Sequence, residues 1–385
     1  MTTIEELLPD DLLETLRGRA AGYDEDNRFF TEDLEDLKAA RYLTMLVPEE
    51  FGGHGLTLRQ ASQAQRRLAQ AAPATALGIN MHHVIMGMAY TLWRRGDHRL
   101  DWVFEDAVKG EIFAFGISEA GNDAVLFDSV STATPSGDGG YTISGTKIFT
   151  SLSPVWTRLV VHARHEDQLV FGFLDRDADG IEIINDWDTL GMRASQSCTT
   201  KLHEVVMRPE RVGTHTPLGP NPDPLVWGIF GAFELLLAAV YTGIGERAVN
   251  LAVEIVGKRR SHVKNAPYAH DPDIRWQIAS AGILMDGVVL QLEKLTGDVD
   301  LVGTGEEPQY GGKWFLHFSG VKGRATEAAK EAVELAVRTT GGSQYFRRSE
   351  LQRLYRDVVA GLYHPSDNES LHASYAKALL GPVRE

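Results

Sequence analysis

Cysteine is almost absent from this chain of 385 residues, which has Cys198 alone. A single cysteine cannot form an intrachain disulfide, so the fold does not depend on oxidative cross-linking. No histidine or second cysteine stands near Cys198 at metal-ligand spacing, and we expect a buried, inert thiol. So little cysteine is typical of a protein of the reducing cytoplasm.

Positive charge is also scarce, with 38 basic against 53 acidic side chains and a formal net charge of -15. Nucleic acids and anionic membranes bind basic surfaces, so neither is expected as the main partner. The N-terminal stretch MTTIEELLPDDLLETL lacks the basic start and apolar run of a signal peptide. We therefore expect a cytoplasmic protein.

Several short motifs that carry chemistry are missing. There is no CxxC or HExxH pattern, so no metal site is expected. The lack of GxGxxG and GxSxG leaves a Rossmann-type nicotinamide site and a serine hydrolase without support, and no Walker loop occurs either. The common routes to redox, hydrolytic and phosphate chemistry are thus unsupported by motif.

Long apolar runs are limited to GIFGAFELLLAAVYTGIG at 228–245, which is barely long enough to cross a membrane. It is rich in glycine, and Glu234 is its one charged residue. We expect the core helix of a soluble protein rather than a membrane span. An unpaired buried carboxylate costs several kcal/mol, so Glu234 must be paired, neutral or functional.

Periodicity divides the chain into three parts. Residues 1–110 are predicted to be helical, with a break at VPEEFGGHGLTLRQ. Residues 111–220 alternate in short β-branched or aromatic runs between turn clusters such as SGDGG, which predicts an antiparallel β-domain. Residues 221–385 return to helical periodicity in long segments at 226–260, 272–299, 313–340 and 366–380. The expected fold class is α+β and multidomain: N-terminal helices, a middle β-domain and a C-terminal four-helix bundle.

Five motifs follow one another along the chain. They are VPEEFGGHG (47–55), FAFGISEAGND (113–123), ISGTKIFTS (143–151), LGMRASQSCTTKLHEVVMRPERV (190–212) and VRTTGGSQYFRRSELQRLYRDV (337–358). In this order they resemble the acyl-CoA dehydrogenase superfamily over nearly the whole chain. The resemblance implies a bound flavin, normally FAD, between the β-domain and the C-terminal helices.

By position, the resemblance carries flavin contacts onto Phe115, Ile117, Ser118, Phe149 and Ser151. The first three would line the ring, with Ser118 donating near its pyrimidine edge. Phe149 would stack on one face, and Ser151 would lie near N5. A flavin ring needs a flat apolar wall and a few aimed donors, which these residue types supply. Without the motifs, both serines would be ordinary strand-end hydroxyls.

The resemblance also assigns residues to the distal half of the cofactor. Arg259 falls where the family places an arginine on the pyrophosphate of a neighbouring subunit, and Gly341 and Gly342 fall where bare backbone meets the same group. This implies at least a homodimer, and a dimer and a tetramer are both open. The alternative for Arg259 is a solvated helix end. The segment SEAGND departs from the family pattern, since it is shorter and lacks a proline and a serine.

The identity of the residue that removes a proton distinguishes the two enzyme activities that this sequence could support. Many family members have a glutamate after the tyrosine that follows the Arg-Asp pair, but here Tyr363 is followed by His364. Glu234 is one substitute, because another branch of the family takes its base from an earlier helix. Anchored on Gly243 and Arg247, Glu234 stands one residue late, with Phe233 in the expected position. Its alternative is a structural pairing with an arginine on an adjacent helix.

His364 is the other candidate. A histidine after this Arg-Asp pair resembles flavin monooxygenases of the same fold, such as dibenzothiophene monooxygenase, in which it assists oxygen activation. A near-neutral pKa suits a side chain that manages protons. The pair His82-His83 resembles early-helix histidines of those enzymes. Taken singly, His364 would be a polar turn residue, and His82 and His83 would be part of an ordinary helix face.

The sequence therefore predicts a flavoprotein oxidoreductase. The first choice is α,β-dehydrogenation of an acyl thioester, with Glu234 as base and FAD as acceptor. An electron-transfer flavoprotein and a flavin reductase are both open as protein partners. The alternative is a monooxygenase that uses reduced flavin, with FMN, His364 and a flavin reductase. A third possibility is an inactive flavin-binding partner subunit.

Overall fold

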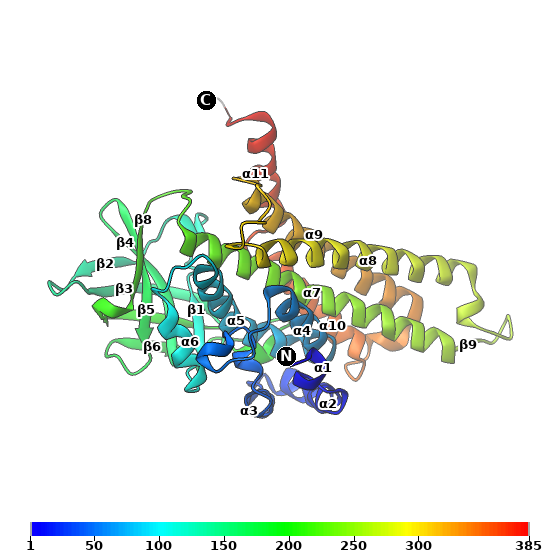
Figure 1. The fold of residues 1–385 in the computed structure, drawn as a ribbon. Coiled ribbons are helices and arrows are strands. Elements are labelled where there is room, and N and C mark those ends of the chain that lie inside the picture. The colour runs from blue at the N-terminus through cyan, green and yellow to red at the C-terminus, as the bar shows by residue number, and fades with distance from the viewer. Residues whose placement is uncertain (1, 384–385) are drawn as a thin grey trace.

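The computed structural model describes residues 2–383. A β-sheet forms one end of the molecule, long C-terminal helices extend toward the other, and N-terminal helices cover the middle (Figure 1). The N-terminal helices are α1 (Ile4–Leu7), α2 (Asp10–Asp26), α3 (Thr31–Ala39), α4 (Leu58–Ala71), α5 (Pro73–Arg94) and α6 (Asp101–Val108).

Helix α5 connects the three parts of the molecule. It begins at Pro73, where a missing backbone N–H is harmless because the first helical turn has no partner for it. The helix is buried along nearly its whole length and packs against α4, α7 and β1. A helix enclosed on all sides must be apolar all round, which explains the uncharged run INMHHVIMGMAYTL within it.

The sheet has the order β6-β7-β3-β2-β4-β5-β8, with β1 paired to β4. Its strands are β1 (Phe113–Gly116), β2 (Thr132–Pro135), β3 (Tyr141–Thr150), β4 (Arg158–His165), β5 (Gln168–Asp175), β6 (Ile181–Ile184), β7 (Cys198–Met207) and β8 (Val212–Pro217). Pairing is antiparallel except that β1 and β2 both run parallel to β4. The sheet is thus mainly antiparallel, and the parallel pairing of β1 with β4 places Phe115 opposite Val160.

The C-terminal part is helical. It comprises α7 (Pro224–Lys258), α8 (Pro272–Asp300), α9 (Lys313–Thr340), α10 (Glu350–Val359) and α11 (Asn368–Leu380), with a hairpin of β9 (Arg260–Ser261) and β10 (Ala266–Pro267) between the first two. The expected fold class is confirmed. The short α10 packs on α7 and α9, whereas α11 contacts α9 mainly through Leu371 and projects from the body (Figure 1).

Helix α7 is the core of the bundle. Among the described residues, it alone is long and apolar enough to cross a membrane, yet 89% of its most apolar window is buried inside the structure. The stretch at 228–245 is therefore a core helix, as the sequence indicates. Burial on all sides explains why Glu234 is its only charged residue between Pro224 and Ile244.

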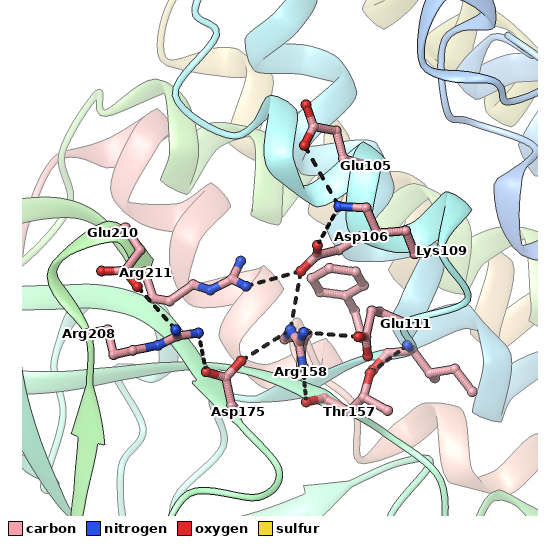
Figure 2. A network of polar contacts seen from close by, with 12 residues as sticks. Glu105, Asp106, Lys109, Glu111, Thr157, Arg158, Asp175, Arg208, Glu210 and Arg211 are labelled. Atoms are coloured by element: carbon pink, nitrogen blue, oxygen red, sulfur yellow. Dashed lines mark hydrogen bonds and ion pairs between the residues drawn. The ribbon is translucent and has the colours of Figure 1, made fainter.

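An ion-pair network joins α6 to the sheet (Figure 2). Arg158 on β4 lies 3.3 Å from Asp106, 3.0 Å from Glu111 and 3.2 Å from Asp175. Arg211 lies 3.2 Å from Asp106 as well. A partly buried network of this kind orients its elements better than isolated surface pairs do. It fixes α6 against β4 and β5, and so fixes the start of β1.

Candidate functional site

Glu234 is the buried carboxylate of α7, and its side chain meets the C-terminal segment. It is 1% exposed. One carboxylate oxygen, Oε1, accepts hydrogen bonds from the backbone N–H of Ser366 at 3.0 Å and from its hydroxyl at 2.8 Å. The other oxygen, Oε2, has no hydrogen-bond partner among the described residues. Burial raises the pKa of Glu234, although the nearby charge of Lys322 and the Ser366 donors oppose this.

Lys322 of α9 holds the same C-terminal segment. Its ammonium group donates to the carbonyl oxygens of Gly361 at 3.0 Å, His364 at 2.6 Å and Ser366 at 3.0 Å. Burial lowers the pKa of Lys322, and the charge of Glu234 opposes that shift. Two buried titratable side chains, one acidic and one basic, thus fasten residues 361–366 from two helices. The structural alternative for Glu234 was a pairing with an arginine of an adjacent helix. Its hydrogen-bond donor is instead Ser366, and the nearby charge is that of Lys322.

His364 lies on this fastened segment and is partly exposed. Its Nδ1 lies 2.9 Å from the hydroxyl of Tyr241, which stands two helical turns after Glu234 on α7. Burial and the charge of Lys322 lower the pKa of His364 to about 3. The imidazole is therefore neutral near pH 7. Gly361 permits the close approach of the segment, since a Cβ there would lie 2.9 Å from the Tyr241 ring.

Phe233, and not Glu234, faces β1. The rings of Phe233 and Phe115 lie 5.4 Å apart between centroids. Successive helical residues differ by about 100° in direction, so Glu234 turns from this contact toward Ser366. The one-residue difference in register noted in the sequence therefore has a structural consequence, because a phenylalanine occupies the wall beside Phe115.

The five residues expected at the flavin ring lie on two neighbouring chain segments, 115–118 and 149–151. Ser118 follows β1, and its carbonyl oxygen accepts the N–H of Ile148 at 2.9 Å. Phe149, at the end of β3, is 57% exposed in a left-handed backbone conformation with φ of 57°. Its ring meets Trp187 edge-on. Ile117 is fully buried.

Ser151 belongs to a chain of three buried hydroxyls. Its Oγ lies 2.7 Å from the Oγ of Ser197, which lies 2.9 Å from the Oγ of Ser195. The hydrogen bond to Ser197 restricts the direction of the Ser151 hydroxyl. The motif predicted a role for Ser151 but gave no indication of Ser195 and Ser197, which come from a turn more than forty residues later in ASQSC. The sequence feature that could have indicated these two residues is the repeated serine beside a predicted strand.

Arg259, Gly341 and Gly342 form a separate group. The Arg259 guanidinium donates to the carbonyl oxygen of Thr340 and lies 3.3 Å from the Ser343 hydroxyl. The structure thus joins Arg259 to the loop that contains both glycines. Twenty-five residues of α7 separate Arg259 from Glu234, a rise of about 37 Å. Within one chain, this group does not join the site around Phe115.

A buried ion pair beneath the site was missed. Lys147 lies 2.7 Å from Glu119, and neither side chain is exposed. Burial acts against the charged form of Glu119, but the charge and hydrogen bonds of Lys147 and Ser131 outweigh it and lower its pKa. Both residues stand inside motifs that the sequence analysis quoted, SEAGND and GTKIF. A lysine inside a strand with alternating burial was the available signal.

Of the two early-helix histidines, His82 binds backbone groups on both sides of its ring. His82 Nε2 donates to the Leu43 carbonyl oxygen at 2.9 Å, and Nδ1 accepts the N–H of Phe113 at 3.2 Å. Both ring nitrogens are thus occupied by backbone, and His82 fixes the start of β1. His83 is fully buried, with its ring edge-on to Tyr42. Cys198 is buried and free, as expected.

Comparison with known families agrees with this architecture. Residues 10–100 match the model of the acyl-CoA dehydrogenase N-terminal domain, residues 114–205 the middle domain and residues 235–368 the C-terminal domain. The chain belongs to the acyl-CoA dehydrogenase family. The superfamily resemblance inferred from the five motifs is confirmed.

Relatives within the family have different names. L-evernosamine nitrososynthase of Micromonospora sp. is 27% identical and covers 93% of this chain and 85% of its own length. Putative acyl-CoA dehydrogenase YdbM of Bacillus subtilis is 27% identical, and the match covers 93% of this chain and 92% of YdbM. Dibenzothiophene monooxygenase of Rhodococcus erythropolis is 26% identical, and the match covers 92% of this chain and 88% of the monooxygenase. The structure of KijD3 with FMN and a dTDP-sugar has a TM-score of 0.86 at 24% identity, covering 100% of this chain and 95% of that chain.

Proposed function

We propose that this protein is a flavin-dependent oxidoreductase whose flavin binds against Phe115, Ile117, Ser118, Phe149 and Ser151. The family membership supports this, and so does the fit of the residues. Phe149 offers an exposed aromatic face, and Ser118 and Ser151 offer hydroxyls on the adjoining segments. A flavin supplies two-electron redox chemistry, which the amino acids of this chain lack.

Of the two reactions open to such a site, we infer that monooxygenation with reduced flavin is the better supported. The observation that carries this inference is the arrangement of Glu234 and Lys322, which together hold the segment that presents His364. Phe233 points toward Phe115, which is where the side chain of a carboxylate base would have to point. This reverses the order of preference that the sequence alone suggested.

His364 and Tyr241 are proposed to hold and transfer the proton that oxygen activation requires. The imidazole is neutral at pH 7, and its Nδ1 pairs with the Tyr241 hydroxyl. General acid–base help from a positioned histidine contributes about 10²–10⁴-fold in rate. The names of the nitrososynthase and dibenzothiophene monooxygenase relatives support a small organic substrate that is oxidised at nitrogen or sulfur. FMN and a separate flavin reductase follow from this proposal.

The test supplies the protein with FMN, a flavin reductase, NADH and ¹⁸O₂, and screens small amines and thioethers for labelled product by mass spectrometry. We expect His364→Ala to lower product formation at least about 10²-fold while hydrogen peroxide rises. FMN binding, followed by fluorescence quenching, should stay unchanged. His372→Ala, at an exposed position of α11, is the matched control. Full product formation by His364→Ala would contradict the role.

Acyl thioester dehydrogenation with FAD is the second candidate, because one oxygen of Glu234 is buried without a partner and its pKa is raised. Both properties suit a carboxylate base. The test adds a panel of acyl-CoA thioesters to the flavin-loaded protein without air. Bleaching of the flavin, abolished in Glu234→Gln, would establish dehydrogenation and refute monooxygenation as the main activity. We expect no bleaching.

A further inference from the structure

A row of phenylalanine rings runs from the proposed flavin site along the first half of α7. Phe115 on β1 lies 5.4 Å from Phe233 between ring centroids. Phe230 stands three residues before Phe233, so both side chains share one face of the helix. The Phe230 ring lies 5.1 Å from that of Phe315 on α9, and Phe315 lies 6.5 Å from Phe127. These five residues are called the phenylalanine wall below.

Much of the phenylalanine wall is open on one side. Four of its rings pack against the core and are still partly exposed: Phe127, Phe230, Phe233 and Phe315. Trp227, one helical turn before Phe230, is buried and meets Trp314 and Phe318 at 5.4 Å between ring centroids. The aromatic packing thus continues into the core. Contiguous apolar surface that is left exposed beside a reaction centre is typical of a ligand-binding surface.

The wall is rigidly held before any ligand binds. Helices α7 and α9, which carry three of the rings, lie side by side (Figure 1). Phe127 ends the 3₁₀ turn Val125–Phe127. His162 Nε2 donates to the Val125 carbonyl oxygen at 2.6 Å, and the N–H of Gly219 donates to the Phe127 carbonyl oxygen at 2.8 Å. A surface that is already ordered costs less entropy when it binds a ligand.

The loop that contains Phe127 carries no positive charge. Residues 118–128, SEAGNDAVLFD, include Glu119, Asp123 and Asp128 and no basic side chain. Lys147 pairs with Glu119, but Asp123 is exposed, and Asp128 has only a 3.7 Å pair with a half-exposed arginine. A diphosphate is normally bound by arginine, lysine or a helix N-terminus. The loop therefore disfavours nucleotide sugars and CoA thioesters, because like charges repel.

We propose that the substrate of this site is an uncharged molecule with a flat aromatic ring, which stacks on the phenylalanine wall and turns its nitrogen or sulfur atom toward Phe115. This inference rests on the proposed function, because the flavin defines the reacting end of the wall. Aromatic rings prefer offset-stacked or edge-to-face contacts. Neighbouring rings of the wall are inclined to each other by 31° to 69°, so a flat ligand finds both kinds of contact.

The first test measures binding by equilibrium dialysis against the FMN-loaded protein, without turnover. Thioanisole and cyclohexyl methyl sulfide have the same thioether and the same number of carbon atoms, but only thioanisole is flat and aromatic. The wild type should bind thioanisole at least about 5-fold more tightly. The anionic 4-(methylthio)benzoate should bind at least about 10-fold more weakly than thioanisole, and CoA and dTDP should not displace thioanisole. Tighter binding of the cyclohexyl or the anionic compound would overturn the proposal.

The second test removes one ring and keeps the apolar surface. Phe230→Leu should lower the affinity for thioanisole about 5-fold and leave that for cyclohexyl methyl sulfide unchanged. Phe127→Leu should have the same selective effect. Phe51→Leu is the matched control, because Phe51 is also partly buried and its ring lies 5.3 Å from another phenylalanine, Phe104, away from the wall. Equal losses for both thioethers would refute recognition of an aromatic ring.

Product formation separates this inference from the proposed function. With FMN, flavin reductase, NADH and ¹⁸O₂, labelled sulfoxide should form faster from thioanisole than from cyclohexyl methyl sulfide. Labelled product from the cyclohexyl compound alone would uphold monooxygenation and refute the aromatic substrate. Binding of thioanisole that depends on Phe230, without labelled product from any thioether or amine, would uphold the wall as an aromatic site and refute monooxygenation.

Discussion

At the scale of single residues, the buried titratable groups are neutralised by partners that the sequence does not place beside them. Glu119 is ionised and paired with Lys147 at 2.7 Å. Glu234 has two donors of Ser366 and the more distant charge of Lys322, and burial leaves its pKa raised. The same side-chain type thus serves as a buried ion in one place and as a potential proton acceptor in the other.

His82 makes the stability of the protein depend on pH. Burial lowers its pKa from 6.5 to about 4, so the unfolded state binds more protons than the folded state between these values. Stability is therefore lost as pH falls through this window. His82→Gln keeps a donor for the Leu43 carbonyl but cannot titrate. Between pH 7.5 and 5 the wild type should lose about 2 kcal/mol more than the variant, as measured by urea unfolding. Equal losses would contradict this assignment.

At the scale of elements, the functional segment is irregular and depends on helices for its position. Residues 361–366 lie between α10 and α11, and beyond the short 3₁₀ turn at Ala360–Leu362 they lack helical hydrogen bonds. Lys322 supplies three bonds to carbonyl oxygens in their place, and Glu234 caps the end of the segment at Ser366. Helices α7 and α9 pack against each other, so a loop held by both can present His364 in one orientation.

Lys322→Met should release this segment. It leaves three carbonyl oxygens and one carboxylate without their buried cation, and unfolding free energy should fall by about 3 kcal/mol. The rate of amide hydrogen exchange should rise in residues 361–366 before it rises in α9. The control is Lys330→Met on the same helix, where the lysine is partly exposed and pairs only weakly with Glu327 at 3.9 Å. Unchanged protection of the segment in Lys322→Met would show that other contacts hold it.

At the scale of the whole molecule, α7 separates two groups of expected cofactor ligands. Phe115 lies against its first half, and Arg259 stands at its C-terminal end, about 37 Å from Glu234. A flavin bound at the first group cannot reach the second group of the same chain. A role for Arg259, Gly341 and Gly342 would therefore require a second subunit and the longer cofactor, FAD.

With FMN as the cofactor, substitutions in the two groups of residues should have different effects on FMN affinity. Phe149→Ala removes an aromatic stacking surface and should weaken FMN binding about 10-fold. Arg259→Ala should leave FMN affinity unchanged, because FMN lacks the pyrophosphate that an arginine fork would bind. Fluorescence titration measures both. A loss of FMN affinity in Arg259→Ala would place that arginine at the flavin phosphate of a neighbouring copy.

The sequence by itself determined the architecture. Helical and alternating patterns, five ordered motifs and one charge in an apolar helix are local properties, and local periodicity follows from backbone geometry. They correctly indicated the three-part fold, the core position of α7 and the burial of Cys198. The antiparallel pattern missed the parallel pairing of β1 with β4, because pairing partners far apart in sequence leave no local signal.

Only the tertiary structure decided how the candidate residues relate to one another. A register shift of one residue on α7 turns Glu234 toward Ser366 and Phe233 toward Phe115. Motif spacing alone could not decide which of these two side chains faces Phe115. The partner of Glu234 comes from a segment 132 residues later. Hydrogen bonding and desolvation depend on distances in space, so the roles of Glu234, Lys322 and His364 appear only when the helices are packed.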